Sequence, residues 1–449
     1  MQISKLSLKN FRCFEDFELE LHPGCTVLVG INGSGKTSVL DGLCVALGSW
    51  FLGFPDLTPR SIYSDEVRRV LVEHDRYDPD LEPRYPTRVE VSGQVFEHEL
   101  DWARELRSET GKTTYGDAVR LKELASEYYE KLSDVDEPLD LPVIAYYGTS
   151  RLWVQKQNSA LKEQGLTSRS SGYQDCLEPA SNHKLFAAWL RRRTLLRLEE
   201  AAKQPDALSR LSFLQSQPDH ALEAIKSAAA GCLDEVESLD YSIKQEDIVI
   251  TFARSVRGVA GGAQVPFSRL SDGYRNLIAM AADIAWRAVR LNPHKIEDMP
   301  GEAVGVVLID EVALHLHPRW QRDVLPALRR VFPKIQFVVT THSPQVLSNV
   351  EASCVRFLQV DEDSVEARQP LVSQGLDTNT ILRDLMEVPE RPVEYARRFE
   401  ELERQIQEQQ FEEDEALLAA LERELGQDDP VLVGLAWELA DEKSHAHDN

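Results

Sequence analysis

The stretch GINGSGKT at residues 30–37 follows an apolar run, CTVLV at 25–29, and precedes apolar residues that recur at helical spacing. This order predicts a strand, a glycine-rich loop and a helix. Glycines let successive backbone N–H groups point into one concavity, and the helix N-terminus adds partial positive charge. Lys36 can then neutralise the β- and γ-phosphates, and Thr37 can offer its hydroxyl to Mg²⁺. The stretch therefore predicts a nucleoside triphosphate site.

Two acidic residues follow another apolar run. Residues 304–309 form an unbroken apolar stretch that suits a central strand covered on both faces. Asp310 and Glu311 come directly after it. Paired with the phosphate loop, Asp310 is placed to hold Mg²⁺ through water, and Glu311 to polarise the water that attacks the γ-phosphate.

Two other segments carry polar residues beside the expected sheet. Ser271 and Gly273, in LSDGYRN, open a helix whose free N–H groups can take a phosphate. The simpler interpretation of Ser271 is a helix N-cap. His342, in VVTTHSP, comes directly after a predicted central strand at 335–340. An isolated histidine at this position is usually structural. A functional role for either segment is therefore supported only by the presence of the other motifs.

Composition excludes several classes of protein. The 449 residues include 50 Lys and Arg against 75 Asp and Glu, a net charge of −25, and 42% are hydrophobic. These values indicate a folded chain of two or three domains and argue against a surface that grips nucleic acid throughout. No apolar stretch of about 18 residues appears, which predicts no membrane span and a cytoplasmic protein. Six scattered cysteines without a C-x-x-C pair predict reduced thiols.

Taken together and in this order, the motifs resemble the ATP-binding-cassette (ABC) class of P-loop ATPases, in its RecF/SMC-like branch. NFRCF at 10–14 fits the first strand of that branch. The resemblance implies an α/β head that binds ATP with Mg²⁺ and hydrolyses it to ADP and phosphate. It also implies that Ser271 and Gly273 form the signature motif, which contacts ATP held by the other subunit of a homodimer. His342 is then the switch histidine that senses the γ-phosphate.

The resemblance yields a set of expected site residues. Glu311, His342 and Lys36 are expected in catalysis, and Thr37 and Asp310 at the metal. The residues expected to contact the nucleotide are Arg12, Asn32, Gly33, Ser34, Gly35, Lys36, Thr37, Ser38, Ser271 and Gly273. The signature departs from LSGGQ, since Asp272 and Tyr274 replace glycine and glutamine.

Longer strings are similar to the bacterial ATPases of the Septu anti-phage type, which are also found beside some retrons. These strings are PVIAYYGTSRLW (142–153), LSDGYRN, DEVALHLHPRWQR (310–322) and TTHSPQVLS. Members of that family are commonly encoded with a small HNH endonuclease. The resemblance therefore implies a defence ATPase that controls a separate nuclease, with DNA contact possible in the complex. Relatives often have D-E-x-[DE] after the second motif, where this chain has Val312-Ala313.

Other functions compete with this interpretation. A RecF- or SMC-like DNA-binding ATPase of repair or recombination is the main alternative, but residues 152–265 lack the long heptads of a coiled-coil arm. An OLD-type nuclease would use the D-x-D at 361–363, yet no second α/β pattern follows. A transporter ATPase is disfavoured by the RecF-like start. A basic helix at 191–197 indicates a solvated face or a nucleic-acid patch.

The chain is expected to divide into four parts. Residues 1–151 and 241–388 form the two halves of the ATPase head, 152–240 an inserted helical lobe, and 389–449 an acidic helical tail. Residues 88–98 are expected to form a hairpin around Ser92-Gly93. The last 60 residues hold 18 acidic and 6 basic side chains, a charge of −12. Apolar stripes in the tail predict helices that dock a partner or pair with each other.

Overall fold

The computed structural model describes residues 1–73, 79–132, 138–152, 168–179, 183–253, 261–361, 364–386, 388, 391–408 and 411–447. Trp153, Glu362 and Asp363, which belong to motifs quoted above, lie outside these ranges. The chain divides into two compact units, Met1–Leu376 and Asp377–Asn449. Within the described ranges, every helix is too short or too polar to cross a membrane.

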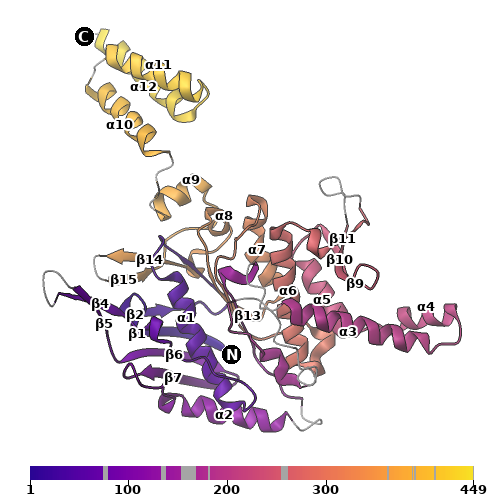
Figure 1. Ribbon diagram of the computed structural model, residues 1–449. Helices are drawn as coiled ribbons and strands as arrows, with labels where there is room; N and C mark the ends of the chain where they lie inside the picture. Colours follow the sequence, from indigo (N-terminus) through magenta and orange to yellow (C-terminus); the bar gives the residue numbers. More distant parts are fainter. Residues whose placement is uncertain are drawn as a thin grey trace. The chain divides into compact units, whose positions relative to one another are not determined.

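A six-stranded sheet runs through the first unit (Figure 1). Its strands are β3 (Cys25–Val29), β8 (Val143–Tyr147), β12 (Gly305–Ile309), β13 (Ile335–Thr340), β14 (Val355–Asp361) and β15 (Ser364–Arg368). Their order is β15-β14-β3-β13-β12-β8, parallel except for the antiparallel pairing of β14 with β15. Every residue of β3, β8, β12 and β13 is buried. Their continuous apolar runs therefore reflect a sheet covered on both faces.

A second, antiparallel sheet has the order β2-β1-β6-β7. Its strands are β1 (Gln2–Phe11), β2 (Phe14–Glu20), β6 (Thr87–Val95) and β7 (His98–Leu106). Helix α1 (Lys36–Leu47) packs against β1, β6 and β7 and also against β13. The helix that starts at the phosphate loop is therefore fixed between two sheets.

The predicted hairpin turn at Ser92-Gly93 is wrong. Strand β6 continues through both residues, and β7 pairs back onto it after a turn that includes Phe96, which has φ of 55°. A Cβ on Gly93 would lie 2.4 Å from the carbonyl oxygen of Gln2 in β1. Glycine is needed at this position for close backbone approach within the sheet, and not for a turn.

The signature segment begins a long buried helix. Helix α6 (Asp272–Leu291) packs against β8, and a fully buried network joins them. The hydroxyl of Tyr147 donates to Asp283 at 2.7 Å, and Arg287 also donates to Asp283, at 2.8 Å. This network ties α6 to the sheet next to the site. The other helices of this part are α2 (Val119–Lys131), α7 (Pro318–Val331) and α8 (Pro344–Leu347).

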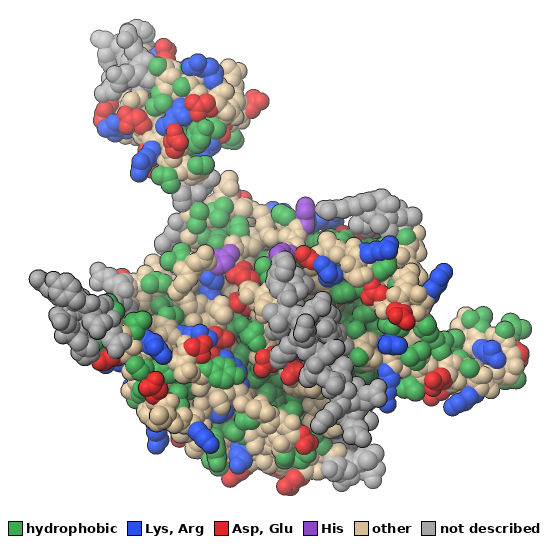
Figure 2. Space-filling view, viewed as in Figure 1, with side chains coloured by type: hydrophobic (Ala, Val, Ile, Leu, Met, Phe, Trp, Pro, Cys, Tyr) green, Lys and Arg blue, Asp and Glu red, His purple; other side chains and the backbone are tan. Residues whose placement is uncertain are grey.

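Helices and a small sheet form the lobe between the two halves. They are α3 (His183–Ala202), α4 (Ala207–Ser216), α5 (His220–Gly231), β9 (Val236–Ser242), β10 (Asp247–Phe252) and β11 (Gln264–Pro266). The pair α3 and α4 projects from the body, and hydrophobic side chains gather on it (Figures 1 and 2). Leu208 is 79% exposed there. In the basic helix, Arg193 pairs with Asp219 and Arg197 donates to the carbonyl of Leu214, so these two arginines fix the lobe.

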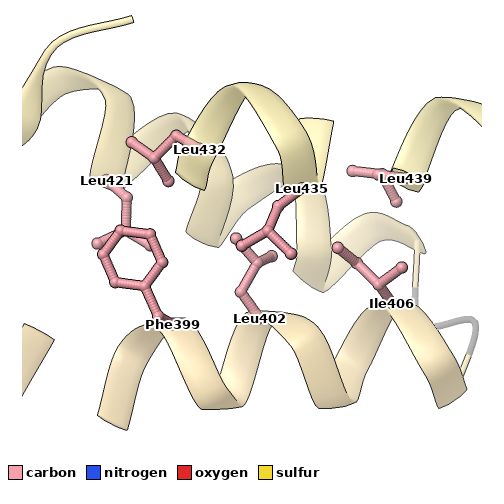
Figure 3. Close-up of a cluster of buried hydrophobic side chains, with 7 residues drawn as sticks. All are labelled: Phe399, Leu402, Ile406, Leu421, Leu432, Leu435 and Leu439. Carbon is pink, nitrogen blue, oxygen red and sulfur yellow. The ribbon is translucent and has the colours of Figure 1, made fainter. Parts of the chain in front are cut away.

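The second unit packs its apolar stripes against one another. After the short helix α9 (Thr378–Thr380), its helices are α10 (Val393–Glu408), α11 (Phe411–Leu425) and α12 (Pro430–His447). Their inward side chains meet in one cluster of Phe399, Leu402, Ile406, Leu421, Leu432, Leu435 and Leu439 (Figure 3). Ion pairs from Arg391 to Asp429 and from Arg398 to Glu424 reinforce it. The apolar stripes therefore do not require an outside partner. Of the two expectations for the tail, the one in which its helices pair with each other describes this unit.

Candidate functional site

The predicted site residues meet at one edge of the parallel sheet. The loop at 30–35 follows β3, Asp310 follows β12, and His342 lies two residues beyond β13. Because β3, β13 and β12 are neighbours in the sheet, their carboxyl ends lie side by side. Ligands of open α/β sheets bind at this edge.

The loop at 30–37 has the backbone geometry of a phosphate cradle. Gly33 and Gly35 have φ of 86° and 91°, a region that favours glycine. A Cβ on Gly35 would lie 2.5 Å from Cζ of Phe14 and 2.8 Å from Sγ of Cys13. Both conformation and space therefore require glycine at 35. Since α1 begins at Lys36, its first N–H groups are available to an anion in the loop.

The Lys36 side chain spans the loop. Its Nζ donates to the carbonyl oxygens of Gly30 at 2.9 Å and Ile31 at 3.0 Å, and the residue is 7% exposed. Burial lowers the pKa of this ammonium group, while Glu311 and Asp310 counteract the shift. An ammonium group has three donors, so it can bind incoming phosphate oxygens from this position.

Asp310 is buried and held by two hydroxyl groups. Thr37 Oγ1 donates to its Oδ2 at 3.0 Å, and Thr340 Oγ1 donates to its Oδ1 at 2.6 Å. A hydroxyl and a carboxylate are the oxygen donors that Mg²⁺ takes from proteins, together with phosphate oxygens and water. Thr37 and Asp310 therefore fit the metal predicted for them.

Glu311 lies next to His342. Its Oε1 is 3.4 Å from His342 Nε2. Burial raises the pKa of the Glu311 carboxyl, with His342 counteracting the shift. Glu311 also has φ of 50°, in the left-handed region that is uncommon for a residue with a side chain. A strained, half-buried carboxylate beside an imidazole is an arrangement suited to proton transfer.

One cavity of about 780 Å³ contains most of the predicted residues. This volume is within the usual range for small-molecule sites. Ser34 is buried in the loop and is not among the lining residues described. The predicted residues that line the cavity are Arg12, Asn32, Gly33, Gly35, Lys36, Thr37, Ser38, Asp310, Glu311 and His342.

Sequence reasoning missed two groups of residues at this site. Thr340 was counted only as the end of an apolar run, yet it contacts Asp310. The hairpin of β4 (Arg69–Glu73) and β5 (Pro79–Pro83) lies at the same cavity, to which Arg69 and Leu81 contribute, and Val67 lines it just before β4. The only signal in the sequence was a charged, proline-rich stretch, which does not reveal where a hairpin packs.

Arg12 lines the cavity but is surrounded by carboxylates. Its guanidinium lies 3.0 Å from Asp41, 3.3 Å from Glu66 and 3.5 Å from Asp65. Burial raises the pKa of Asp41 to about 6 although Arg12 lowers it. A nucleotide contact by Arg12 therefore has to be made with these carboxylates as neighbours.

The signature residues lie elsewhere. Ser271 is exposed at the N-cap position of α6, and its side chain makes no capping hydrogen bond. Gly273 is buried, and a Cβ there would lie 2.7 Å from the carbonyl oxygen of His315. Neither residue is among those described as lining the cavity. At the start of α6, the Ser271 side chain is therefore open to solvent, while Gly273 is enclosed by the chain itself.

Comparisons with known proteins agree with this geometry. The family described as "AAA domain, putative AbiEii toxin, Type IV TA system" matches residues 25–348, and the family "AAA ATPase domain" matches residues 1–48. The "Retron Ec83 probable ATPase" of Escherichia coli is 26% identical over 485 aligned residues, which cover 98% of this chain and 86% of that protein.

Two other comparisons are with a protein that matches a shorter region and with a solved structure. The "Septu protein PtuA" of Bacillus mycoides (strain KBAB4) is 37% identical over 143 residues, which are 32% of this chain and 18% of that protein. A solved SMC head bound to the C-terminal winged-helix domain of ScpA is 15% identical, covers 82% of this chain and 98% of its own, and has a TM-score of 0.47.

Proposed function

The chain belongs to the family described as "AAA domain, putative AbiEii toxin, Type IV TA system", and we propose that it is the ATP-hydrolysing regulatory subunit of a bacterial anti-phage system. Its predicted identity as a Septu/retron-type ATPase with an ABC-type P-loop head is confirmed by the family and the retron relative. In the proposal, nucleotide-dependent dimerisation of the heads controls a separately encoded HNH-type endonuclease. The observation that carries it is the meeting of Lys36, Asp310 and Glu311 in one cavity.

The residues of the cavity have separate roles in the proposed reaction. The N-terminus of α1 and the Lys36 ammonium bind the β- and γ-phosphates. Thr37 and Asp310 would hold Mg²⁺, which would supply positive charge to offset that of the phosphates. Glu311 orients a water and accepts its proton, and His342 lies at the same carboxylate to contact the γ-phosphate. The Glu311 pKa, raised by burial, suits an acceptor of that proton.

We propose that the adenine base binds beside the hairpin of β4 and β5, which lines the same cavity. With the triphosphate fixed at the loop, the nucleoside extends toward Val67, Arg69 and Leu81. Two apolar side chains and a planar guanidinium can together cover the face of a purine. We propose that Arg69 stacks on the adenine.

Replacing Arg69 with alanine is expected to weaken ATP binding about 2- to 30-fold, because a cation over an aromatic face contributes roughly 0.5 to 2 kcal/mol. Tripolyphosphate has no base, so its affinity should not change. Calorimetry with both ligands checks this, and Arg84→Ala, on the same hairpin segment, is the control. An equal loss of affinity for both ligands would show that Arg69 acts on the phosphates instead.

The site requires a second copy of the chain. Ser271 and Gly273 lie outside the described lining of the cavity, and the N-terminus of α6 is exposed. In a head-to-tail pair, this N-terminus closes on the γ-phosphate held by the other chain. The proposal therefore takes a homodimer as the smallest active species.

The second unit is proposed to dock the nuclease. Its stripes are satisfied internally, but Trp437 on α12 is 76% exposed. Exposed tryptophans are frequent anchors of interfaces. The charge of −12 over the last 60 residues attracts a basic, DNA-binding protein.

We expect the chain to copurify with the nuclease encoded by its neighbouring reading frame, and DNA cleavage by the complex to differ with and without ATP. Trp437→Ser in the full chain should lose the nuclease and keep ATP binding. The control is Leu208→Ser, which removes an equally exposed side chain from the lobe. Control of a nuclease would be refuted if DNA cleavage did not depend on ATP, or if the protein encoded by the neighbouring reading frame did not bind the chain.

A further inference from the structure

The buried hydroxyl of Thr340 joins the carboxylate of Asp310 to the backbone N–H of Glu311. The residue ends β13 and is 0% exposed. Its Oγ1 donates to Asp310 Oδ1 at 2.6 Å and accepts from the backbone N–H of Glu311 at 2.7 Å. We propose that Thr340 is a positioning residue that sets both the metal-binding orientation of Asp310 and the aim of Glu311. This proposal rests on the ATP-hydrolysing function proposed above.

The contact with Asp310 decides which carboxylate oxygen faces the metal. Oδ1 is occupied by Thr340, so Oδ2 is directed at Thr37, 3.0 Å away. Thr37 is the hydroxyl that the phosphate loop presents to Mg²⁺. Without the Thr340 hydroxyl, the carboxylate can rotate about its side chain, and Oδ1 is left buried without this donor. Loss of Thr340 should therefore weaken the gain in ATP affinity that Mg²⁺ provides.

The contact with Glu311 supports a strained backbone. Glu311 has φ of 50°, and its carboxylate lies 3.4 Å from His342. Such a conformation persists only where surrounding bonds impose it. The 2.7 Å bond from its N–H to Thr340, and the bond from the N–H of Val312 to the Thr340 carbonyl at 3.0 Å, are two of these bonds. Removing the hydroxyl should therefore misdirect the proton acceptor.

Valine is the sharp substitution at this position, because it keeps the shape of threonine and removes both hydrogen bonds. The ratio of ATP affinity with Mg²⁺ to ATP affinity in EDTA should be about 10- to 100-fold smaller in Thr340→Val than in wild type, because hydrogen bonds to charged groups are strong. Affinity measured in EDTA should stay unchanged, and kcat should fall by about the same factor or more. Thr340→Ser keeps the hydroxyl and should restore both quantities.

Calorimetry of ATP binding with Mg²⁺ and with EDTA provides the main readout, and thermal unfolding checks the fold. The matched control is Thr26→Val in β3, since Thr26 is also 0% exposed and its hydroxyl accepts from the backbone N–H of His22 at 2.9 Å. If Thr340→Val unfolds, Thr340→Ser and Thr340→Ala must still differ in the Mg²⁺-dependent gain.

The outcomes distinguish a failure of the Thr340 proposal from a failure of the proposed ATP site. A wild-type chain that gains no ATP affinity from Mg²⁺ would overturn the proposed ATP site itself. Three results would overturn the positioning role alone, provided that Mg²⁺ raises the ATP affinity of the wild-type chain. The Mg²⁺-dependent gain in affinity could persist in Thr340→Val, it could stay lost in Thr340→Ser, or it could be lost equally in Thr26→Val.

Discussion

Replacing Glu311 with glutamine is expected to lower kcat for ATP hydrolysis by about 10²- to 10⁴-fold and to leave ATP bound, because general-base catalysis contributes a factor of that size. Glutamine keeps the size of the side chain beside His342, 3.4 Å away, but cannot accept the proton of the attacking water. The phosphate contacts of Lys36 and the loop are unaffected. The variant should therefore hold uncleaved ATP.

Single-turnover hydrolysis of labelled ATP, together with equilibrium binding, measures both effects. Glu351→Gln, which alters an exposed glutamate beyond α8, serves as the control and should match wild type. Hydrolysis at the wild-type rate by Glu311→Gln would remove Glu311 from the mechanism. Loss of binding would instead make it a structural residue of the loop.

The second large effect is expected from Lys36→Ala, which should weaken ATP binding by about 100-fold or more. Charged hydrogen bonds to phosphate contribute roughly 1.5 to 3 kcal/mol each, and this ammonium group can make more than one of them. The same Nζ also joins the carbonyls of Gly30 and Ile31, so the empty loop loses two bonds as well.

Thermal unfolding separates these two consequences. Lys334→Ala removes an exposed lysine that pairs with Glu302 and should change neither ATP affinity nor unfolding temperature. A Lys36→Ala chain that unfolds like wild type but fails to bind ATP supports the direct phosphate contact. An unchanged ATP affinity would contradict the assignment of the whole loop.

Much of the head could be predicted because local sequence and tertiary role coincide there. The run at 25–29 is apolar at every position because β3 is central, and Gly35 is glycine because the loop gives it a φ of 91°. Such constraints are visible in one stretch of sequence. The strand, loop and helix around residues 25–47 therefore follow from pattern alone.

Residues whose role depends on strand order could not be predicted. Thr340 matters because β13 lies between β3 and β12, which places its hydroxyl beside Asp310. A threonine in a β-branched run carries no sign of this. The turn predicted at Gly93 was wrong for a related reason. The residue that requires glycine there, Gln2 on the adjacent strand, is distant in sequence. The stripes of the tail showed which faces are apolar but not that α10, α11 and α12 cover one another.

The measurement that tests the composite ATP site most directly mixes two inactive variants, Lys36→Ala and Ser271→Arg. Each variant alone has no intact pair of phosphate loop and signature motif. A mixed dimer keeps one such pair, formed by Lys36 of one chain and Ser271 of the other. With random exchange between symmetric dimers, the account predicts recovery of about one quarter of the wild-type ATPase rate. If the mixture stays inactive while mass measurements show mixed dimers, a site shared between two chains is contradicted.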